Sequence, residues 1–246
     1  MACRYSLFPE SLMEQPGDYY SKNRSELLDL MPPLEGTAVL DVGCGEGGLG
    51  RLLKEKGCSR IYGIEPVTDA ARIAETAYDR IFNCDVESAM ESLPEDLFDI
   101  IVCADVLEHL KDPWEILERL KKNLKRNGAV VASIPNIRNG RVIGRLLRGE
   151  FGYDKEGILD KTHLRFFTFN GIIRLFGDCG YKVVQIVPVY YKEAETQIPL
   201  WMQNDVPAKL EDLARILTGS ELKLRDDELL DFFTFQFLLR AVPVRQ

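Results

Sequence analysis

Long apolar runs are absent from this 246-residue sequence. It contains no stretch of 18 or more apolar residues, which is the length that a helix needs to span a bilayer. The amino-terminal residues MACRYSLFPESLMEQ also lack the basic segment followed by an apolar segment that marks a secretory signal. Paired cysteines are missing too, because the six cysteines stand singly and form no CxxC motif. We therefore expect no transmembrane segment and no export, and we expect a cytoplasmic protein with reduced thiols.

An excess of positive charge is also absent. The chain has 31 basic and 39 acidic side chains, which gives a net charge of −8. This balance opposes the counterion release that drives binding to nucleic acid, so we expect no nucleic-acid partner. Histidine is scarce as well: His109 and His163 are the two histidines of the chain, and they limit the choice of a general base.

Four apolar segments bounded by turn residues alternate with helical patterns. They read TAVLDV, RIYGIE, DIIVCA and AVVASI, at residues 37–42, 60–65, 99–104 and 129–134. Strands that alternate with helices are typical of strand-helix-strand units and a parallel sheet. With 46% apolar residues the chain can bury a sizeable core. We therefore predict a doubly wound α/β fold in a single domain, residues 1–246.

One helix is predicted from Pro113 to about Lys125. Asp112 is a suitable N-cap residue, Pro113 suits the first helical position, and Asn127-Gly128 could end the helix in the left-handed conformation. The predicted buried stripe of this helix consists of Trp114, Leu117, Leu120 and Leu124. After it, residues 170–191 predict a helix followed by a strand, and residues 232–244 predict a long strand.

Two segments, at about 136–168 and 191–230, are too long for ordinary connections, and we expect both to cover a substrate. The first has arginines at roughly helical intervals: Arg138, Arg141, Arg145 and Arg148. Such a stripe is usually a solvated face, but arginine also pairs well with phosphate, so the stripe suggests an anionic substrate. The second contains a predicted amphipathic helix from about Pro207 to Gly219. Its inward face is expected to consist of Leu210, Leu213, Ile216 and Leu217.

The stretch VLDVGCGEGGLG, residues 39–50, places a glycine-rich loop directly after a strand. Its G-x-G-x-x-G pattern admits a dinucleotide, but Asp41 would repel a pyrophosphate. Glu65 ends the next strand, where it could accept ribose hydroxyls, and Asp85 follows a third strand, where it could accept from an exocyclic amine. Because ligands of open α/β sheets bind at the carboxyl ends of the strands, the three acids together favour a nucleoside that bears an amino acid.

The pattern D-x-G-x-G-x-G, followed by Glu65, Asp85 and FDIIVCADVLEHL, resembles class I S-adenosylmethionine-dependent methyltransferases over residues 18–190. The segments DYYSKNR, SIPNIRN and GILDKTHLRFFT resemble the branch found with polysaccharide enzymes and related to ubiquinone-biosynthesis O-methyltransferases. The resemblance implies a Rossmann-like, seven-strand, mostly parallel sheet with helices on both faces. It also implies that the last strand inserts antiparallel beside the fifth. The implied cofactor is S-adenosylmethionine.

The resemblance also assigns residues to the cofactor. It implies that Asp41, Gly43 and Gly45 cradle the methionine part, with Cys44 beside them. Glu65 and Pro66 are expected at the ribose, and Asp85 and Val86 at the adenine. Ala104 and Asp105 are expected on the sulfonium side. Tyr19 or Tyr20 could close over the cofactor or simply pack on the edge of the sheet.

Methyl transfer needs an aligned acceptor, and a hydroxyl acceptor needs in addition a general base or a metal. The candidate catalytic residues are His109, His163 and Glu108, with His109 as the favoured base; both histidines could instead have structural roles. Asp105, Glu108 and His109 share one helical face and, with His163, could hold a divalent metal. This layout resembles the metal site of small-RNA 2′-O-methyltransferases, which carry Glu at the position of Asp105.

The sequence thus predicts an enzyme that transfers a methyl group to a hydroxyl of a small, sugar-like or anionic acceptor, such as a nucleotide- or lipid-linked sugar in polysaccharide biosynthesis. Three alternatives stay open. They are an N-methyltransferase, a nicotinamide-dependent oxidoreductase, and a cofactor-binding subunit without activity of its own.

Overall fold

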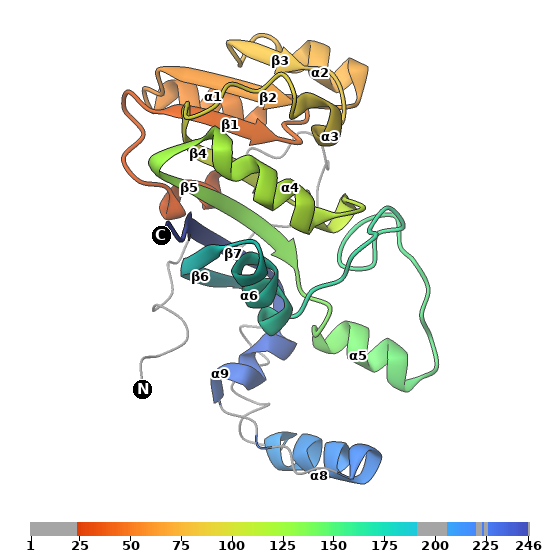
Figure 1. Cartoon of the computed structure of the whole chain (residues 1–246). Helices are drawn as coiled ribbons and strands as arrows, with labels where there is room; N and C mark the ends of the chain where they lie inside the picture. The colour runs from red at the N-terminus through yellow and green to blue at the C-terminus, as the bar shows by residue number, and fades with distance from the viewer. Residues whose placement is uncertain (1–23, 191–205, 220–222, 224–225, 246) are drawn as a thin grey trace.

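A computed structural model describes residues 24–190, 206–219, 223 and 226–245 (Figure 1). Tyr19 and Tyr20 lie outside the described residues. The described strands form one seven-stranded sheet in the order β3-β2-β1-β4-β5-β7-β6, parallel except for β7, which is antiparallel to β5 and to β6. The strands are β1 (Ala38–Val42), β2 (Arg60–Ile64), β3 (Arg80–Phe82), β4 (Phe98–Ala104), β5 (Leu124–Pro135), β6 (Tyr181–Tyr190) and β7 (Thr234–Pro243). The predicted insertion of the last strand beside the fifth is confirmed.

Helices cover both faces of the sheet (Figure 1). The α-helices of the described residues are α1 (Gly48–Glu55), α2 (Thr68–Ala74), α3 (Val86–Ala89), α4 (Pro113–Leu120), α5 (Gly140–Leu147), α6 (Phe169–Asp178), α8 (Val206–Thr218) and α9 (Asp226–Leu229). Four 3₁₀ helices join them in the described residues: η1 (Ser25–Leu30), η2 (Leu107–His109), η3 (Lys121–Asn123) and η4 (Leu230–Phe232). α3, α4 and α6 pack on one face, and η1, α1 and the end of α2 pack on the other.

The alternation of β1 decides what each of its residues faces. Leu40 belongs to the core under α4, while Val39 belongs to the core under α1. Because successive side chains of a strand point to opposite faces, Asp41 lies on the same face as Val39. Asp41 is therefore directed toward the α1 side, close to the glycine loop that follows the strand.

The helix predicted from Pro113 is shorter than expected. Asp112 accepts a hydrogen bond from the backbone N–H of Glu115 at 2.9 Å, which confirms the N-cap. α4 nevertheless ends at Leu120, and β5 already begins at Leu124, so the prediction that Asn127-Gly128 ends a helix is wrong. The reason is sheet pairing: Leu124 pairs with Phe98 of β4, which takes the chain out of the helix. Trp114, expected in the buried stripe, is 38% exposed.

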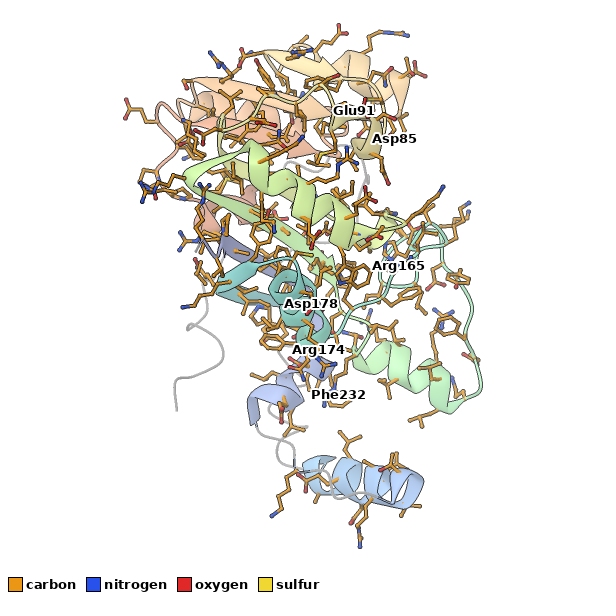
Figure 2. All side chains as sticks on the ribbon, viewed as in Figure 1. Asp85, Glu91, Arg165, Arg174, Asp178 and Phe232 are labelled. Carbon is orange, nitrogen blue, oxygen red and sulfur yellow. The ribbon has the colours of Figure 1, made fainter. Side chains whose placement is uncertain are left out.

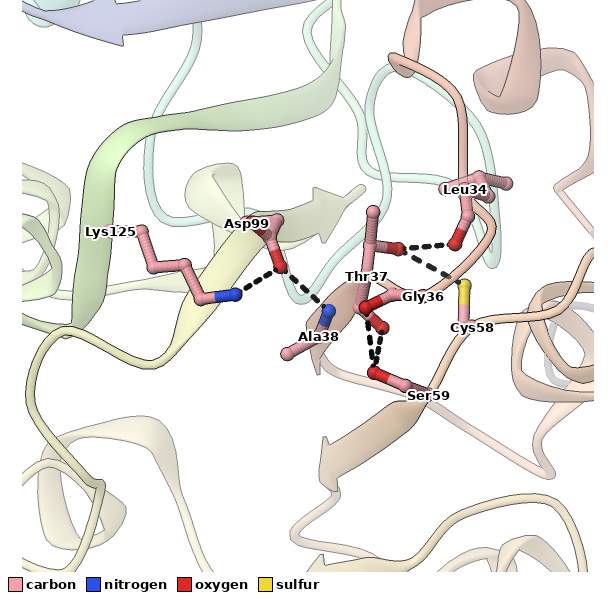
Figure 3. A network of polar contacts seen from close by, with 8 residues as sticks. All are labelled: Leu34, Gly36, Thr37, Ala38, Cys58, Ser59, Asp99 and Lys125. Carbon is pink, nitrogen blue, oxygen red and sulfur yellow. Dashed lines mark hydrogen bonds and ion pairs between the residues drawn. The ribbon is translucent and has the colours of Figure 1, made fainter.

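Polar contacts join the amino-terminal ends of the strands, at the end of the sheet opposite the glycine loop (Figure 3). Asp99 accepts hydrogen bonds from the backbone N–H of Ala38 at 2.8 Å and from Lys125 Nζ at 2.7 Å, so one carboxylate joins β1, β4 and β5. Ser59 donates to the carbonyl oxygen of Gly36 at 2.8 Å, which ties the start of β2 to the turn before β1. The strands are thereby held in register at this edge.

The segment 136–168 leaves the sheet after β5 and returns before α6. Its two ends meet in a parallel bridge between Asn136 and Phe167. Its return limb contacts η2, because the carbonyl oxygen of Glu108 accepts from the backbone N–H groups of Leu164 and Arg165 at 2.8 and 3.0 Å. The segment therefore lies against the end of β4, where η2 begins.

Much of the arginine stripe of this segment is used within the protein. Arg145 pairs with Asp154 at 2.6 Å, and Arg148 pairs with Glu150 at 3.3 Å. Arg138 pairs with the buried Asp231 at 3.2 Å. Intramolecular ion pairs thus account for three positions of the stripe, and they weaken its value as evidence for an anionic substrate.

α8 matches the amphipathic helix predicted in the second long segment, but its packing differs. Leu210 and Leu213 are partly buried, whereas Ile216 is 75% exposed. The expectation that Ile216 packs inward is wrong, since α8 projects away from the sheet (Figure 1). In the described part of the chain, no helix is both long and apolar enough to cross a membrane.

Candidate active site

One large cavity opens at the carboxyl ends of β1, β2 and β4, with a volume of about 970 Å³. This volume lies at the upper end of the range for small-molecule and cofactor sites, roughly 300–1,000 Å³. The cavity brings together every residue that the sequence placed at the cofactor. They are Asp41, Gly43, Cys44, Gly45, Glu65, Pro66, Asp85, Val86, Ala104 and Asp105.

The glycine loop forms the floor of the cavity. The backbone N–H groups of Gly43 and Cys44 both donate to the carbonyl oxygen of Ile64, at 2.8 and 3.0 Å, so the loop is attached to the end of β2. Gly43 has a φ of 70° and Gly45 a φ of 53°, in the left-handed region that glycine enters without strain. The thiol of Cys44 is buried and its pKa is raised, because burial disfavours the thiolate.

Glu65 connects the loop to the next turn. One carboxylate oxygen accepts from the N–H of Gly45 at 2.8 Å, and the other accepts from the N–H of Val67 at 2.9 Å. The side chain is 4% exposed, yet it lines the cavity. Since each carboxylate oxygen has two acceptor positions, Glu65 can still accept hydrogen bonds from a ligand.

Asp41 is the most deeply buried acid of the cavity wall, with 2% exposure. The hydroxyl of Tyr78 donates to its Oδ2 at 2.5 Å. Burial raises the pKa of Asp41 to about 7, while the Tyr78 hydrogen bond and the nearby Arg24 act in the opposite direction. Asp41 is therefore poised between its charged and neutral forms near neutral pH.

Asp85 has a capping role in addition to its place in the wall. It is the N-cap of α3 and accepts from the N–H of Ser88 at 2.7 Å, a contact that lowers its pKa. The side chain is exposed and lies on the same wall as Glu91 (Figure 2). Asp85 can thus offer its second oxygen to a ligand at the outer end of the cavity.

Asp105 lies at the end of the cavity nearest η2, in a left-handed conformation with a φ of 51°. Its carboxylate pairs with Arg24 at 2.7 Å and accepts a short hydrogen bond from the Ser133 hydroxyl. Arg24 also lines the cavity, and sequence reasoning missed it. The available signal is its position as the last residue of DYYSKNR, in which Tyr19 and Tyr20 are the predicted contacts.

Glu108, His109 and His163 form a cluster at the edge of the cavity. Their nearest candidate ligand atoms all lie within 4.8 Å of one another, and the two imidazole centroids are 4.7 Å apart. His109 lines the cavity, whereas Glu108 and His163 lie behind it. His163 Nδ1 lies 3.0 Å from the carbonyl oxygen of Ile158, which assigns the proton to Nδ1 and leaves Nε2 as an acceptor. Burial lowers the pKa of His163, so its ring is neutral at pH 7.

Glu108 is an unusual member of this cluster. It is 1% exposed, and neither carboxylate oxygen has a hydrogen-bond partner in the described residues. Burial, with the charge of Asp105, raises its pKa well above the ordinary value. A buried carboxyl group without partners is costly, and a bound cation would remove that cost.

The metal set differs from the predicted one at a single residue. Glu108, His109 and His163 lie together, but Asp105 is engaged by Arg24 and Ser133 instead. The short side chain and left-handed backbone of Asp105 direct its carboxylate toward β5. Two imidazoles and one carboxylate are a donor set that suits zinc and other divalent metals.

The fold is shared with S-adenosylmethionine-dependent methyltransferases of known structure. One from Archaeoglobus fulgidus superimposes with a TM-score of 0.59 at 21% identity, over 88% of this chain and 91% of that one. A model of the methyltransferase domain family matches residues 15–186. The chain therefore belongs to this family, and the recognition of a class I S-adenosylmethionine-dependent methyltransferase is confirmed.

Several ubiquinone biosynthesis O-methyltransferases are similar to this chain. The ubiquinone biosynthesis O-methyltransferase of Paracidovorax citrulli is 32% identical over 145 residues, which cover 52% of this chain and 60% of that protein. The enzyme of the same name from Rickettsia akari is 24% identical over 80% of this chain and 74% of its own length. Two further relatives of this name are matched over 41% and 44% of their lengths.

Proposed function

We propose that the chain binds S-adenosylmethionine in the cavity and transfers its methyl group to a hydroxyl of a small acceptor. The observation that carries the proposal is the convergence of Asp41, Glu65 and Asp85, from three neighbouring strands, on the wall of one cavity. Asp41 suits an ammonium group, Glu65 the ribose hydroxyls, and Asp85 an exocyclic amine. The order of the three acids along the cavity matches the order of these groups in the cofactor.

A hydroxyl acceptor is favoured over an amine by His109. A hydroxyl must lose its proton during transfer, and a general base contributes roughly 10²–10⁴-fold to such a step. His109 is half-buried, lines the cavity, and has Nδ1 3.1 Å from the Thr162 hydroxyl, so one nitrogen is held while the ring faces the cavity. The names of the O-methyltransferase relatives agree with this choice.

The acceptor is proposed to be small and sugar-like, and to enter beside the segment 136–168. Thr162 and Leu164 of this segment line the cavity, which supports a role of the segment in covering the acceptor. Lys111 lines the cavity and supplies positive charge there, so an anionic acceptor keeps some support despite the paired arginine stripe. The single-domain organisation, the covering role of residues 191–230, and a polysaccharide pathway in the cytoplasm stay predictions.

Calorimetric titration with S-adenosylhomocysteine tests the cofactor site directly. Wild type should bind, and Glu65→Gln should bind much more weakly because one oxygen acceptor is lost at the ribose. Glu75→Gln, an exposed acid of the turn after α2 that does not line the cavity, is the matched control and should bind as wild type does. If wild type shows no binding, or if Glu65→Gln and Glu75→Gln bind equally well, the proposed site is wrong.

We propose in addition that Glu108, His109 and His163 hold a divalent metal ion. The fit rests on the buried, unpartnered carboxylate of Glu108 and on the neutral His163 ring with its Nε2 available. A bound divalent ion would supply Lewis acidity toward the acceptor hydroxyl, and this activation would replace general-base catalysis by His109, which would then be a metal ligand. The donor atoms would have to move closer together, because atoms that share one zinc ion lie roughly 3–4 Å apart.

Zinc and manganese titrations of the protein test this second proposal without an acceptor. Wild type should bind one ion, and Glu108→Gln should lose it because the carboxylate charge is removed. Asp105→Asn should keep the ion, since Asp105 is not part of the cluster. Equal affinity in wild type and Glu108→Gln would leave His109 as a base without a metal.

A further inference from the structure

Tyr78 lies behind the glycine loop, where no part of the proposed function uses it. It follows α2 in the turn before β3 and is 5% exposed. It belongs to the core on the α1 side of the sheet and does not line the cavity. A tyrosine buried at this depth must find partners for its hydroxyl, and the identity of those partners is informative.

The ring of Tyr78 fills space that glycines leave open. A methyl group on Gly50, in α1, would lie 2.5 Å from the ring atoms Cε2 and Cζ. A methyl group on Gly47, at the N-cap of α1, would lie 3.2 Å from Cε2. One on Gly63, in β2, would lie 3.2 Å from Cδ1, although Ile81 and Cys44 would be nearer, at 2.6 and 2.8 Å. Three glycines from the loop, the helix and the neighbouring strand therefore surround one ring. Part of the glycine content of this region follows from the ring and not from the cofactor.

The hydroxyl of Tyr78 joins the first turn of α1 to Asp41. It accepts from the backbone N–H of Gly50 at 3.1 Å and therefore directs its own proton to Asp41 Oδ2 at 2.5 Å. The N–H of Gly50 belongs to the first turn of α1, whose donors have no partner within the helix. Gly47, the N-cap residue, has no side chain to supply one. Tyr78 takes over this capping role from another part of the chain.

We propose that Tyr78 is a positioning residue for the cofactor. Its ring fixes the path of the glycine loop, and its hydroxyl holds Asp41 Oδ2, so that Oδ1 is left to accept from the ammonium group of the methionine part. The inference rests on the proposed function, because it assumes that Asp41 faces this ammonium group. In the described residues the Asp41 carboxylate receives no other hydrogen bond than that from Tyr78.

The charge state of Asp41 links Tyr78 to a measurable quantity. A hydrogen bond donated to a carboxylate favours its ionised form, and an ammonium ligand binds that form. The charged and titratable groups near Asp41 come from several elements. They are Tyr78 before β3, Arg24 before η1, Cys44 of the loop, Glu65 after β2 and Cys103 of β4. Removal of the Tyr78 hydroxyl leaves these other groups in place.

The experiment is calorimetric titration with S-adenosylhomocysteine between about pH 6 and pH 8.5 on wild type, Tyr78→Phe and Tyr181→Phe. Tyr181→Phe is the matched control, because its buried hydroxyl donates to the Leu117 carbonyl oxygen at 2.9 Å, away from the cavity. At pH 7 we expect Tyr78→Phe to bind roughly tenfold more weakly, since hydrogen bonds to charged groups are the stronger ones. Its affinity should recover toward the wild-type value as the pH rises. Tyr181→Phe should show the wild-type affinity and pH profile.

A double-mutant cycle of Tyr78→Phe with Asp41→Asn tests whether Tyr78 affects cofactor binding through the Asp41 carboxylate. If Tyr78 acts through the Asp41 carboxylate, Tyr78→Phe should cost much less affinity in the Asp41→Asn background than in wild type. A wild type that binds, together with a Tyr78→Phe variant of unchanged affinity and pH profile, would overturn the inference while leaving the proposed function intact. An equal loss at every pH would also overturn it, because packing alone would then explain the loss. Absence of binding by wild type would instead overturn the proposed function, and the inference with it.

Discussion

At the scale of single residues, Asp41 couples the cavity to the stability of the fold. Burial raises its pKa in the folded protein to about 7, against an ordinary value of 3.8. The folded state therefore holds the Asp41 proton more tightly than the unfolded state does. Between these two pKa values, unfolding releases a proton, so the free energy of unfolding falls as the pH rises. The contribution of Asp41 is fully present below pH 3.8 and is lost as the pH rises through about 7.

We predict that the free energy of unfolding of the ligand-free protein decreases from about pH 4 to pH 7 by up to about 1.4 kcal/mol per unit through this group. Asp41→Asn should show a smaller slope over the same window, because the amide does not titrate. Urea denaturation at a series of pH values measures both slopes. Glu108, whose pKa is also raised, is present in both proteins, so it cancels in the comparison. Identical slopes would show that Asp41 keeps its ordinary pKa.

The sequence predicted those residues of the site that follow the end of a recognisable strand. Asp41, Glu65 and Asp85 follow recognisable strands, and the structure brings them to one cavity. Tyr78 had no such signal, because it reaches Asp41 from 37 positions along the chain through the fold alone. The sequence predicts that Asp105 lies at the cofactor, but its pairing with Arg24 depends on a left-handed backbone conformation that the sequence does not predict.

At the scale of elements, substitution by alanine should change the stability of the protein in opposite directions at Gly50 in α1 and at Gly177 in α6. A methyl group on Gly50 would meet the Tyr78 ring at 2.5 Å, whereas one on Gly177 in α6 would meet nothing within 4 Å. We predict that Gly50→Ala destabilises the protein by roughly 1–3 kcal/mol through overpacking. Gly177→Ala should stabilise it by roughly 0.5–1 kcal/mol, because alanine is the better helix former. Chemical denaturation of both variants tests the pair, and a loss of stability of the same size in both would refute the role of the ring.

Strands were predicted better than helix ends, and the reason is physical. The buried strands are short apolar runs between turn residues, so β1, β2 and β4 agree with prediction to within a residue at each end. The end of α4 instead depends on the pairing of Leu124 with Phe98, a contact with a distant part of the chain. The exposure of Ile216 likewise depends on where α8 projects, which its own amphipathic pattern does not specify.

At the scale of the whole molecule, the segment 136–168 is attached to the carboxyl-terminal part of the chain as well as to η2. Asn136 Nδ2 donates to the carbonyl oxygens of Asp231 and Thr234 at 2.7 and 3.0 Å. Arg138 pairs with Asp231 and places its guanidinium 4.6 Å from the centre of the Phe232 ring. The sequence suggested an anionic substrate for the arginine stripe, because the partner of Arg138, which lies 93 positions further along the chain, could not be foreseen.

The ion pairs of the arginine stripe therefore differ in how much they should stabilise the fold. Asp231 is 1% exposed at its side chain and Arg138 is 25% exposed, whereas the side chains of Arg148 and Glu150 are 61% and 55% exposed. Loss of one partner from a buried pair leaves a desolvated charge and typically costs about 3–5 kcal/mol. Loss of a solvent-exposed pair costs about 0–1 kcal/mol. Because Arg138 is partly exposed, its loss should fall somewhat below the buried range.

We predict that Arg138→Ala lowers the free energy of unfolding by roughly 2–4 kcal/mol, while Arg148→Ala changes it by less than about 1 kcal/mol. Arg138→Lys should recover part of the loss, because lysine keeps the charge but lacks the planar group that lies over Phe232. Urea denaturation at low and high salt measures all three variants, and salt should affect the exposed pair more than the buried one. If Arg138→Ala is as mild as Arg148→Ala, the contact with Asp231 does not hold the segment, and the arginine stripe regains its interpretation as a surface for an anionic substrate.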